Sequence, residues 1–203
     1  MSERLILERD CTFVHLVDCP PPSDCVYTCK KEAKIDTFFH QDFPEYEREQ
    51  LGTTYGYYLG EERKQLVAAF TIANSALILD FLQSARKNKV NKEIPRVKQR
   101  RQYPALLICQ LAVFDEFKGM DLGDQVLDHI SQLGLILGRQ CACRFLLVEA
   151  VNKPKVIDFY SRNGFVMMYS SEEVEIEKMK RKVYEDGHLA TRLMMMDLAS
   201  ILD

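Results

Sequence analysis

The chain has 203 residues, of which 47% are hydrophobic, and a formal net charge of −3 at pH 7. This length suits one domain with a substantial core, and the charge gives no overall attraction to polyanions. No apolar run approaches the roughly 18 residues that a membrane-spanning helix needs, and the first ten residues, MSERLILERD, are too charged for a secretory signal. We therefore expect a soluble, cytoplasmic protein.

Seven cysteines lie between positions 11 and 143, and their odd number argues against a disulfide framework. The densest group, Cys19, Cys25 and Cys29 with Cys11 and His15 upstream, leaves zinc binding open as an alternative. This group lacks paired Cys-x-x-Cys hooks, however, and CPPPSDC would be a stiff ligand loop. We therefore predict reduced thiols and no metal site.

The first half of the chain predicts a strand, a helical stretch and a β-hairpin. CTFVHLV, at 11–17, is a strand candidate. Residues 34–52 predict a helix that Pro44 interrupts and Gly52 ends, with an apolar stripe of Ile35, Phe38, Phe39 and Phe43. Two β-rich runs, 53–59 and 64–74, flank a charged turn and predict a hairpin, and a short helix is expected over 75–84.

Residues 86–101, RKNKVNKEIPRVKQRR, form a basic segment within an acidic protein. They contain eight lysines and arginines, opposed by Glu93 alone. One interpretation is a solvated loop that keeps the chain soluble. The other is a surface that docks a phosphate backbone, because lysine and arginine at this density gain affinity by releasing counterions.

The second half predicts alternating strands and helices. Its elements are strands at 103–114, 143–152, 165–170 and 190–198, and helices at 122–137, 153–164 and 172–187. Gly138 is the expected end of the first helix, and the helix at 172–187 reads as exposed and charged. The succession of strand, helix and strand from 103 to 152 predicts a crossover between parallel strands.

A turn bracketed by Gly119 and Gly123 connects the strand at 103–114 to the helix after it. A loop that opens a helix presents unpaired backbone N–H groups, and the helix dipole attracts anions to them. The full Gly-x-Gly-x-x-Gly fingerprint is missing. The turn therefore predicts phosphate binding without identifying the ligand.

Two motifs, LAVFDEFKGMDLGDQVL at 111–127 and VEAVNKPKVIDFYSRNGF at 148–165, resemble the GCN5-related N-acetyltransferase (GNAT) superfamily, with a likeness that runs from about 53 to 198. The resemblance implies a mixed α/β (α+β) fold, in which helices flank a mostly antiparallel central sheet with a splayed pair of parallel strands. It also implies a single domain, 1–203, whose sections are an N-terminal strand and helices (1–52), a core with the acetyl-CoA site (53–170), and a charged helix and final strand (171–203).

The resemblance further implies acetyl-CoA as the cofactor, in a cleft between the strands at 105–114 and 144–151. Backbone groups of Leu111, Ala112 and Val113 would pair with pantetheine. The pyrophosphate would rest on amides of Lys118, Gly119, Met120, Asp121, Leu122, Gly123 and Asp124. Asn152 matches a family asparagine beside the pantetheine arm, and Tyr160 matches the tyrosine suited to protonate the departing thiolate. Glu149, at a strand end, is a candidate base acting through water.

Two residues depart from the family pattern. Lys118 stands where glutamine or arginine is usual, which keeps the charge but loses planar bidentate bonding. Asp121 replaces the middle glycine, where its carboxylate would repel a diphosphate and, at a position with positive φ, would add strain. The alternative is that Asp121 points outward and caps the helix through an N–H of Gly123 or Asp124.

We therefore expect an N-acetyltransferase that moves an acetyl group from acetyl-CoA to a primary amine. The basic segment and the compact FYSRNGF motif resemble the toxin branch of the superfamily, which implies an aminoacyl-tRNA acceptor bound through 86–101. We further expect a homodimer, and we expect no association with a membrane. The alternative function is a catalytically degenerate GNAT-fold module that binds acyl-CoA or a partner without turnover.

Overall fold

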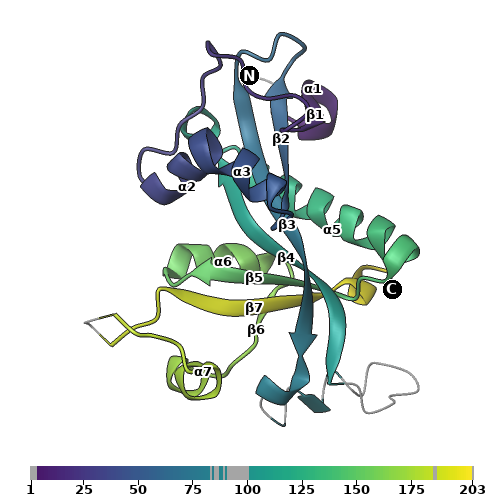
Figure 1. The fold of residues 1–203 in the computed structure, drawn as a ribbon, viewed down its shortest axis with the longest axis vertical. Helices are drawn as coiled ribbons and strands as arrows, with labels where there is room; N and C mark the ends of the chain where they lie inside the picture. The colour runs from purple at the N-terminus through teal and green to yellow at the C-terminus, as the bar shows by residue number, and fades with distance from the viewer. Residues whose placement is uncertain are drawn as a thin grey trace. The chain divides into compact units, whose positions relative to one another are not determined.

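The computed structural model describes residues 4–82, 84, 87–88, 90, 101–184 and 187–202. Within these residues the chain forms a seven-stranded sheet in the order β1-β2-β3-β4-β5-β7-β6, with helices flanking it (Figure 1). The sheet is mostly antiparallel, and β4 and β5 are its parallel pair. The predicted mixed α/β fold and its parallel pair are therefore confirmed. No helix in the described residues has the length and apolar character needed to cross a membrane.

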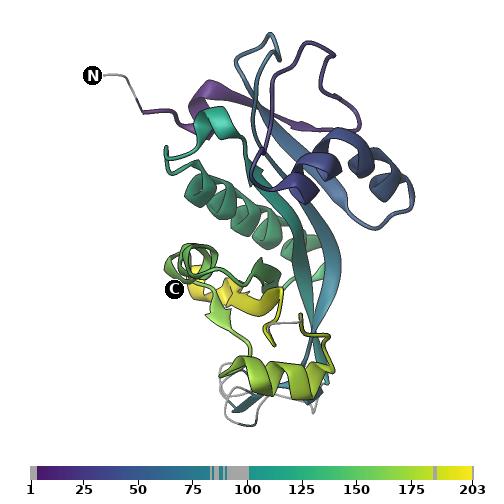
Figure 2. The same cartoon turned by 90° about the vertical axis from the view of Figure 1, so that its left-hand side faces the viewer.

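The chain divides into two compact units, each built from distant parts of the sequence. The first unit contains Met1–Ala73 and Ile108–Gln132, and the second contains Asn74–Leu107 and Leu133–Asp203. The long elements β3 (Leu66–Ile78), β4 (Gln102–Val113) and α5 (Leu122–Cys141) each contribute residues to both units. Figure 2 shows α5 as one uninterrupted helix.

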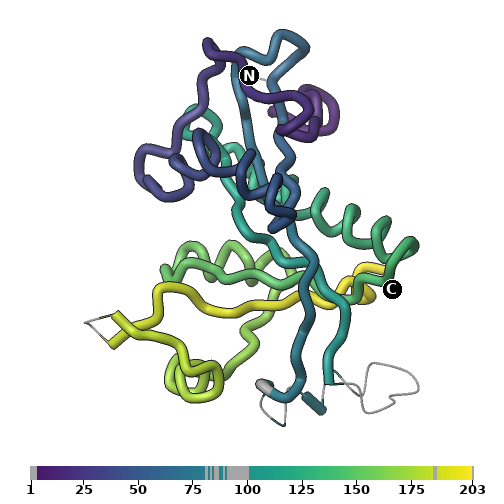
Figure 3. Tube along the Cα trace, viewed as in Figure 1, coloured from purple at the N-terminus to yellow at the C-terminus, as the bar shows by residue number. Residues whose placement is uncertain are grey.

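The first unit is built around antiparallel strands. Its N-terminal elements are α1 (Leu7–Asp10), β1 (Cys11–His15), α2 (Ala33–Thr37), α3 (Phe43–Arg48) and β2 (Thr53–Leu59). β2 pairs with β1 on one side and with β3 on the other, so the predicted hairpin is confirmed; its two strands can be followed side by side in Figure 3. All seven cysteines carry reduced thiols, and only Cys29 among them is fully buried.

The helical stretch from Ala33 to Arg48 continues through Pro44 instead of breaking there. A π-helical turn, Phe38–Asp42, joins α2 to α3, and the Phe43 N–H donates to the Phe38 carbonyl. Pro44 lies in the first turn of α3, directly after this π-helical turn. The predicted apolar stripe is in place, since Phe38, Phe39 and Phe43 are buried in one cluster and the partly buried Ile35 packs against it.

His15 links β1 to α3 through two carboxylates. Its Nδ1 lies 2.7 Å from Asp18 Oδ2, and its Nε2 contacts Glu47 Oε1. Burial opposes protonation of this imidazole, but the hydrogen bonds to Asp18 and Glu47 outweigh burial and raise the pKa of His15. The charged form is therefore stabilised by folding.

We predict that this link weakens as the pH rises. Because the pKa of His15 is raised in the folded state, its contribution is complete below the unfolded pKa and is lost as pH rises through the folded value. Between about pH 6 and pH 8 the free energy of unfolding should fall by about 0.5–1 kcal/mol from this source. His15→Gln should remove that part of the slope in urea titrations, and an unchanged slope would contradict the prediction.

The second unit is built on strands that come late in the chain. β5 (Phe145–Val151) pairs antiparallel with β7 (Thr191–Asp197), which also pairs with the short β6 (Val166–Met167). Helices α6 (Pro154–Arg162) and α7 (Glu172–Met179) belong to the same unit. The strand predicted over 165–170 is therefore only two residues long. The helix predicted over 75–84 is wrong at its start, because β3 continues to Ile78 and a 3-10 turn, Leu79–Phe81, follows.

Helix α5 passes its predicted end at Gly138 and stops at Cys141. The left-handed position after the helix belongs to Ala142, with φ +62°, whose N–H donates to the Gly138 carbonyl at 3.1 Å. Gly138 has another role, because a Cβ there would lie 3.2 Å from the Cys143 carbonyl oxygen. The glycine therefore permits close chain packing and does not end the helix.

Candidate active site

The predicted phosphate loop lies in the first unit. β4 ends at Val113, a 3-10 turn covers Asp115–Phe117, and α5 starts at Leu122. Gly119 has φ +84°, a value that glycine adopts without steric cost. The structure therefore places Leu111, Ala112 and Val113 at the end of β4, and Lys118 to Asp124 at the opening of a long helix.

Lys118 is held within the loop by Asp115. The Lys118 ammonium donates to Asp115 Oδ1, while Asp115 Oδ2 accepts from the Lys30 N–H at 2.9 Å. The hydrogen bond from Lys118, followed by that from Lys30, lowers the pKa of Asp115. The Asp115 N–H also donates to the Thr28 carbonyl at 2.9 Å, so the loop is fixed to the segment at 28–30.

Asp121 has a positive φ of +56°. Its carboxylate is exposed, and its Oδ2 accepts from Arg4 Nη2 at 3.1 Å. The guanidinium offsets part of the negative charge that the departure from glycine brings to this loop. Sequence reasoning missed Arg4, which lies 117 residues earlier and gives no local signal of the pairing.

Tyr160 is buried in α6, in the second unit. Its ring packs between Phe159 and Phe165, with centroids at 5.0 and 5.3 Å, and the residue is 7% exposed. Burial raises the pKa of the phenol, so it stays protonated at neutral pH. A protonated hydroxyl is the form that a proton donor requires.

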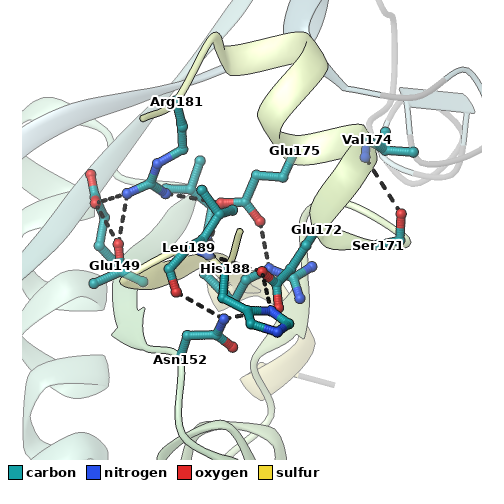
Figure 4. A network of polar contacts seen from close by, with 12 residues as sticks. Glu149, Asn152, Ser171, Glu172, Val174, Glu175, Arg181, His188 and Leu189 are labelled. Atoms are coloured by element: carbon teal, nitrogen blue, oxygen red, sulfur yellow. Dashed lines mark hydrogen bonds and ion pairs between the residues drawn. The ribbon is translucent and has the colours of Figure 1, made fainter. Parts of the chain in front are cut away.

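Glu149 and Asn152, at the end of β5, are both engaged in a polar network (Figure 4). Glu149 Oε2 accepts from Arg181 Nη2 at 2.7 Å and from Thr191 Oγ1 at 3.1 Å. The Asn152 side-chain amide donates to Glu172 Oε1 and to the Leu189 carbonyl, both at 2.9 Å. Asn152 and Glu172 also line a pocket of about 560 Å³.

Glu175 is the centre of this network, although the sequence predicts that it is exposed. It is fully buried, and its carboxylate accepts from Arg181 Nη1 at 2.9 Å, Arg192 Nε at 2.8 Å and the Leu193 N–H at 3.0 Å. Arg181 therefore bridges Glu175 to Glu149. A run as charged as EEVEIEKMKRK gives no sign that one of its glutamates is inside.

The predicted site residues fall into two sets. The first unit holds the β4 end and the loop from Lys118 to Asp124. The second unit holds Glu149, Asn152 and Tyr160; Glu149 bonds to Arg181, and Asn152 bonds to Glu172. Among the described residues, no group of three metal-ligating side chains is arranged to hold a metal ion.

The seven-stranded sheet, with its parallel β4–β5 pair and the loop that opens α5, is a fold that the chain shares with several solved structures. No protein-family model matches the chain, and no curated protein sequence matches it. Similar solved structures include a tyrosine-to-phenylalanine mutant of KacT, with TM-score 0.69 and 19% identity over 96% of this chain and 98% of that one. AtaT complexed with acetyl-methionyl-tRNAfMet has TM-score 0.67 and 18% identity, over 95% of this chain and 98% of that one. AtaTR bound with AcCoA has TM-score 0.66 and 19% identity, over 95% of this chain and 96% of that one.

Proposed function

We propose that this protein transfers the acetyl group of acetyl-CoA to the amine of an aminoacyl-tRNA in the cytoplasm. The observation that carries the proposal is the loop at the opening of α5, with positive φ at Gly119 and Asp121, in a chain with the GNAT fold. Of the similar structures, AtaTR is bound with AcCoA, and AtaT is complexed with acetyl-methionyl-tRNAfMet. A homodimer stays a prediction from the sequence.

Acetyl-CoA supplies an activated acetyl group, and the chain must hold it and move two protons. Backbone N–H groups from Lys118 to Asp124 would hold the pyrophosphate, and an N–H near Val113 would face the carbonyl oxygen of the acetyl group. A nitrogen–carbon bond forms as the carbon–sulfur bond breaks. Glu149 takes a proton from the amine through water, and Tyr160 gives a proton to the sulfur.

One observation favours the alternative of a module without turnover. Glu149 Oε2 already accepts from Arg181 Nη2 at 2.7 Å and from Thr191 Oγ1 at 3.1 Å, and both contacts would have to be displaced before this oxygen could accept a proton. A binding module would keep the loop and the fold but would not acetylate an amine. Activity therefore separates the two candidates.

The direct test supplies acetyl-CoA with aminoacyl-tRNA, and with the same tRNA lacking its amino acid. We expect the acetyl label to appear on the amino acid of the charged tRNA alone. If labelled acetyl-CoA binds but no labelled aminoacyl-tRNA forms, the binding module becomes the better account. If acetyl-CoA does not bind, both functions fail.

We also propose that the tRNA docks on the basic segment 86–101. Of its eight cationic residues, only Lys87 and Arg101 lie within the described residues; Arg86, Lys89, Lys92, Arg96, Lys98 and Arg100 lie outside them. Lys87 Nζ lies 3.5 Å from Asp80 Oδ1, and Arg101 Nε lies 3.8 Å from Asp80 Oδ2. The Arg101 side chain is 87% exposed.

Neutralising four of these residues together should weaken tRNA binding and flatten its salt dependence. The variant carries Arg96→Gln, Lys98→Gln, Arg100→Gln and Arg101→Gln, and the salt slope should fall by roughly one unit for each cation that bound a phosphate in the parent. Acetyl-CoA affinity should not change, which provides the internal control. A salt slope equal to that of the parent would leave the segment as a solvated loop.

Two substitutions at Asp121 separate its charge from its backbone strain. Asp121→Asn removes the charge but keeps a side chain that tolerates positive φ, so acetyl-CoA affinity should rise by about threefold to tenfold. Asp121→Gly should give the same gain in affinity and also raise the free energy of unfolding by about 0.5–1 kcal/mol. Calorimetric titration and urea unfolding measure the two effects. Equal affinity in all three proteins would show that the carboxylate does not face the diphosphate.

A further inference from the structure

A pocket of about 640 Å³ lies in the first unit, and of its described lining residues only Asp124 belongs to the proposed acetyl-CoA site. The N-terminal segment, β1, β2 and the first turns of α5 contribute its walls. Pockets that take small organic molecules measure roughly 300–1,000 Å³. The size of this pocket therefore fits a ligand of that kind.

The inner wall of the pocket is aromatic. Phe13, Tyr57 and His129 line it, and the Phe13 centroid lies 5.0 Å from that of Tyr57 and 4.4 Å from that of His129. His129 Nδ1 is hydrogen-bonded to the Tyr57 hydroxyl. Burial lowers the pKa of His129 despite the opposing charges of Asp128 and Glu8, so the imidazole is neutral at physiological pH. The aromatic wall therefore carries no positive charge.

Carboxylates from two elements line the same pocket: Glu8 from α1, and Asp124 and Asp128 from α5. Asp128 accepts a hydrogen bond from the neutral amide of Gln132 at 2.9 Å, which leaves its charge in place. Arg4 is the cationic side chain among the described lining residues, and its guanidinium is paired with Asp121, outside the pocket. The carboxylates of Glu8 and Asp128 therefore give the pocket a negative potential, because the guanidinium of Arg4 is paired with Asp121.

We propose that this pocket binds a small organic cation, a primary ammonium carried on an apolar body. The ammonium would be held by Glu8 and Asp128 through charge-assisted hydrogen bonds. The apolar body would lie against Phe13 and the neutral imidazole of His129, which are both partly exposed, whereas Tyr57 is only 2% exposed and supports them. An anion would meet repulsion here, and the described residues offer no metal-ligating cluster.

The first experiment compares phenethylamine with 2-phenylethanol, which has a similar shape and no charge. Binding to the full chain is followed through the imidazole resonances of His129 and by calorimetry. We expect phenethylamine to bind about tenfold more tightly than the alcohol, because the alcohol forms no ion pair. Equal affinities, or no change at His129 at millimolar ligand, would overturn the proposal.

The second experiment removes the charges of the pocket. The double variant Glu8→Gln, Asp128→Asn should weaken phenethylamine binding about tenfold and leave 2-phenylethanol unaffected. Glu61→Gln is the matched control, because it removes an exposed carboxylate of the same unit outside the pocket and should change nothing. If the control weakens binding as much as the double variant, net charge and not the pocket governs affinity, and the proposal fails.

The same ammonium chemistry is carried by free amines and by lysine side chains of proteins. N-acetyl-lysine N-methylamide represents the second source and is titrated alongside phenethylamine. Tighter binding of the lysine derivative assigns the pocket to a partner protein, and tighter binding of phenethylamine assigns it to a metabolite. If neither binds, or the double variant binds both as the parent does, the pocket is not a cation site.

Discussion

Glu175→Gln is expected to lower the free energy of unfolding by about 3 kcal/mol or more, the loss typical when a buried ion pair loses one partner. The substitution keeps the volume of the side chain but removes the charge that faces two guanidinium groups. Arg192 and Arg181 are only 10% and 20% exposed, so water cannot replace the missing carboxylate. Urea unfolding, followed by fluorescence or circular dichroism, measures the change.

Glu177→Gln is the matched control for this prediction. It lies on the same helix, α7, and is exposed, so its substitution should alter the free energy of unfolding by less than about 0.5 kcal/mol. A similar loss in both variants would mean that helix α7 responds to net charge and that the buried network contributes little.

Tyr160→Phe is expected to lower the turnover of the acetyl transfer about tenfold to a hundredfold, the low end of the range for a general acid. The fold should be unaffected, because the ring and its contacts with Phe159 and Phe165 remain. No hydrogen bond joins the Tyr160 hydroxyl to the described part of the chain, so its removal leaves no partner unsatisfied. Steady-state kinetics and acetyl-CoA titration measure the two effects separately.

Tyr169→Phe provides the comparison. Tyr169 is a second tyrosine of the same unit, 1% exposed, and its hydroxyl has no hydrogen-bond partner among the described residues. Its substitution should leave turnover unchanged. Equal turnover in the parent and in both variants would remove Tyr160 from the mechanism, although a transferase that relies on water would still be active.

Prediction from the sequence was most accurate where apolar side chains recur with the period of a helix or a strand. The apolar spacing of α5 and the β-rich runs of β2 and β3 led to the correct elements, because burial of one face selects such periods. The loop from Lys118 to Asp124 was also placed correctly. A glycine-marked turn between a buried strand and a helix is a local pattern.

Prediction failed where the role of a residue depends on a contact or a local irregularity that the sequence pattern does not carry. Gly138 reads as a helix end, yet it makes room for Cys143. Pro44 reads as a break, yet the π-helical turn before it lets the helix continue. Glu175 reads as exposed, because its two arginine partners become neighbours only when β7 and the segment after α7 come together.

The partners of Gln125 restrict which residues can occupy its position. Its side-chain Oε1 accepts from the Leu7 N–H at 2.8 Å, and its Nε2 donates to the Leu5 carbonyl at 3.2 Å. In a parallel β-bridge, one residue donates its N–H to the carbonyl of the residue before its partner and accepts from the N–H of the residue after it. The Gln125 amide makes these same two bonds on either side of Ile6 and so takes the place of a bridging residue. Glutamate could only accept and lysine could only donate. A survey of substitutions at this partly exposed position should therefore find far fewer tolerated residues than its exposure implies.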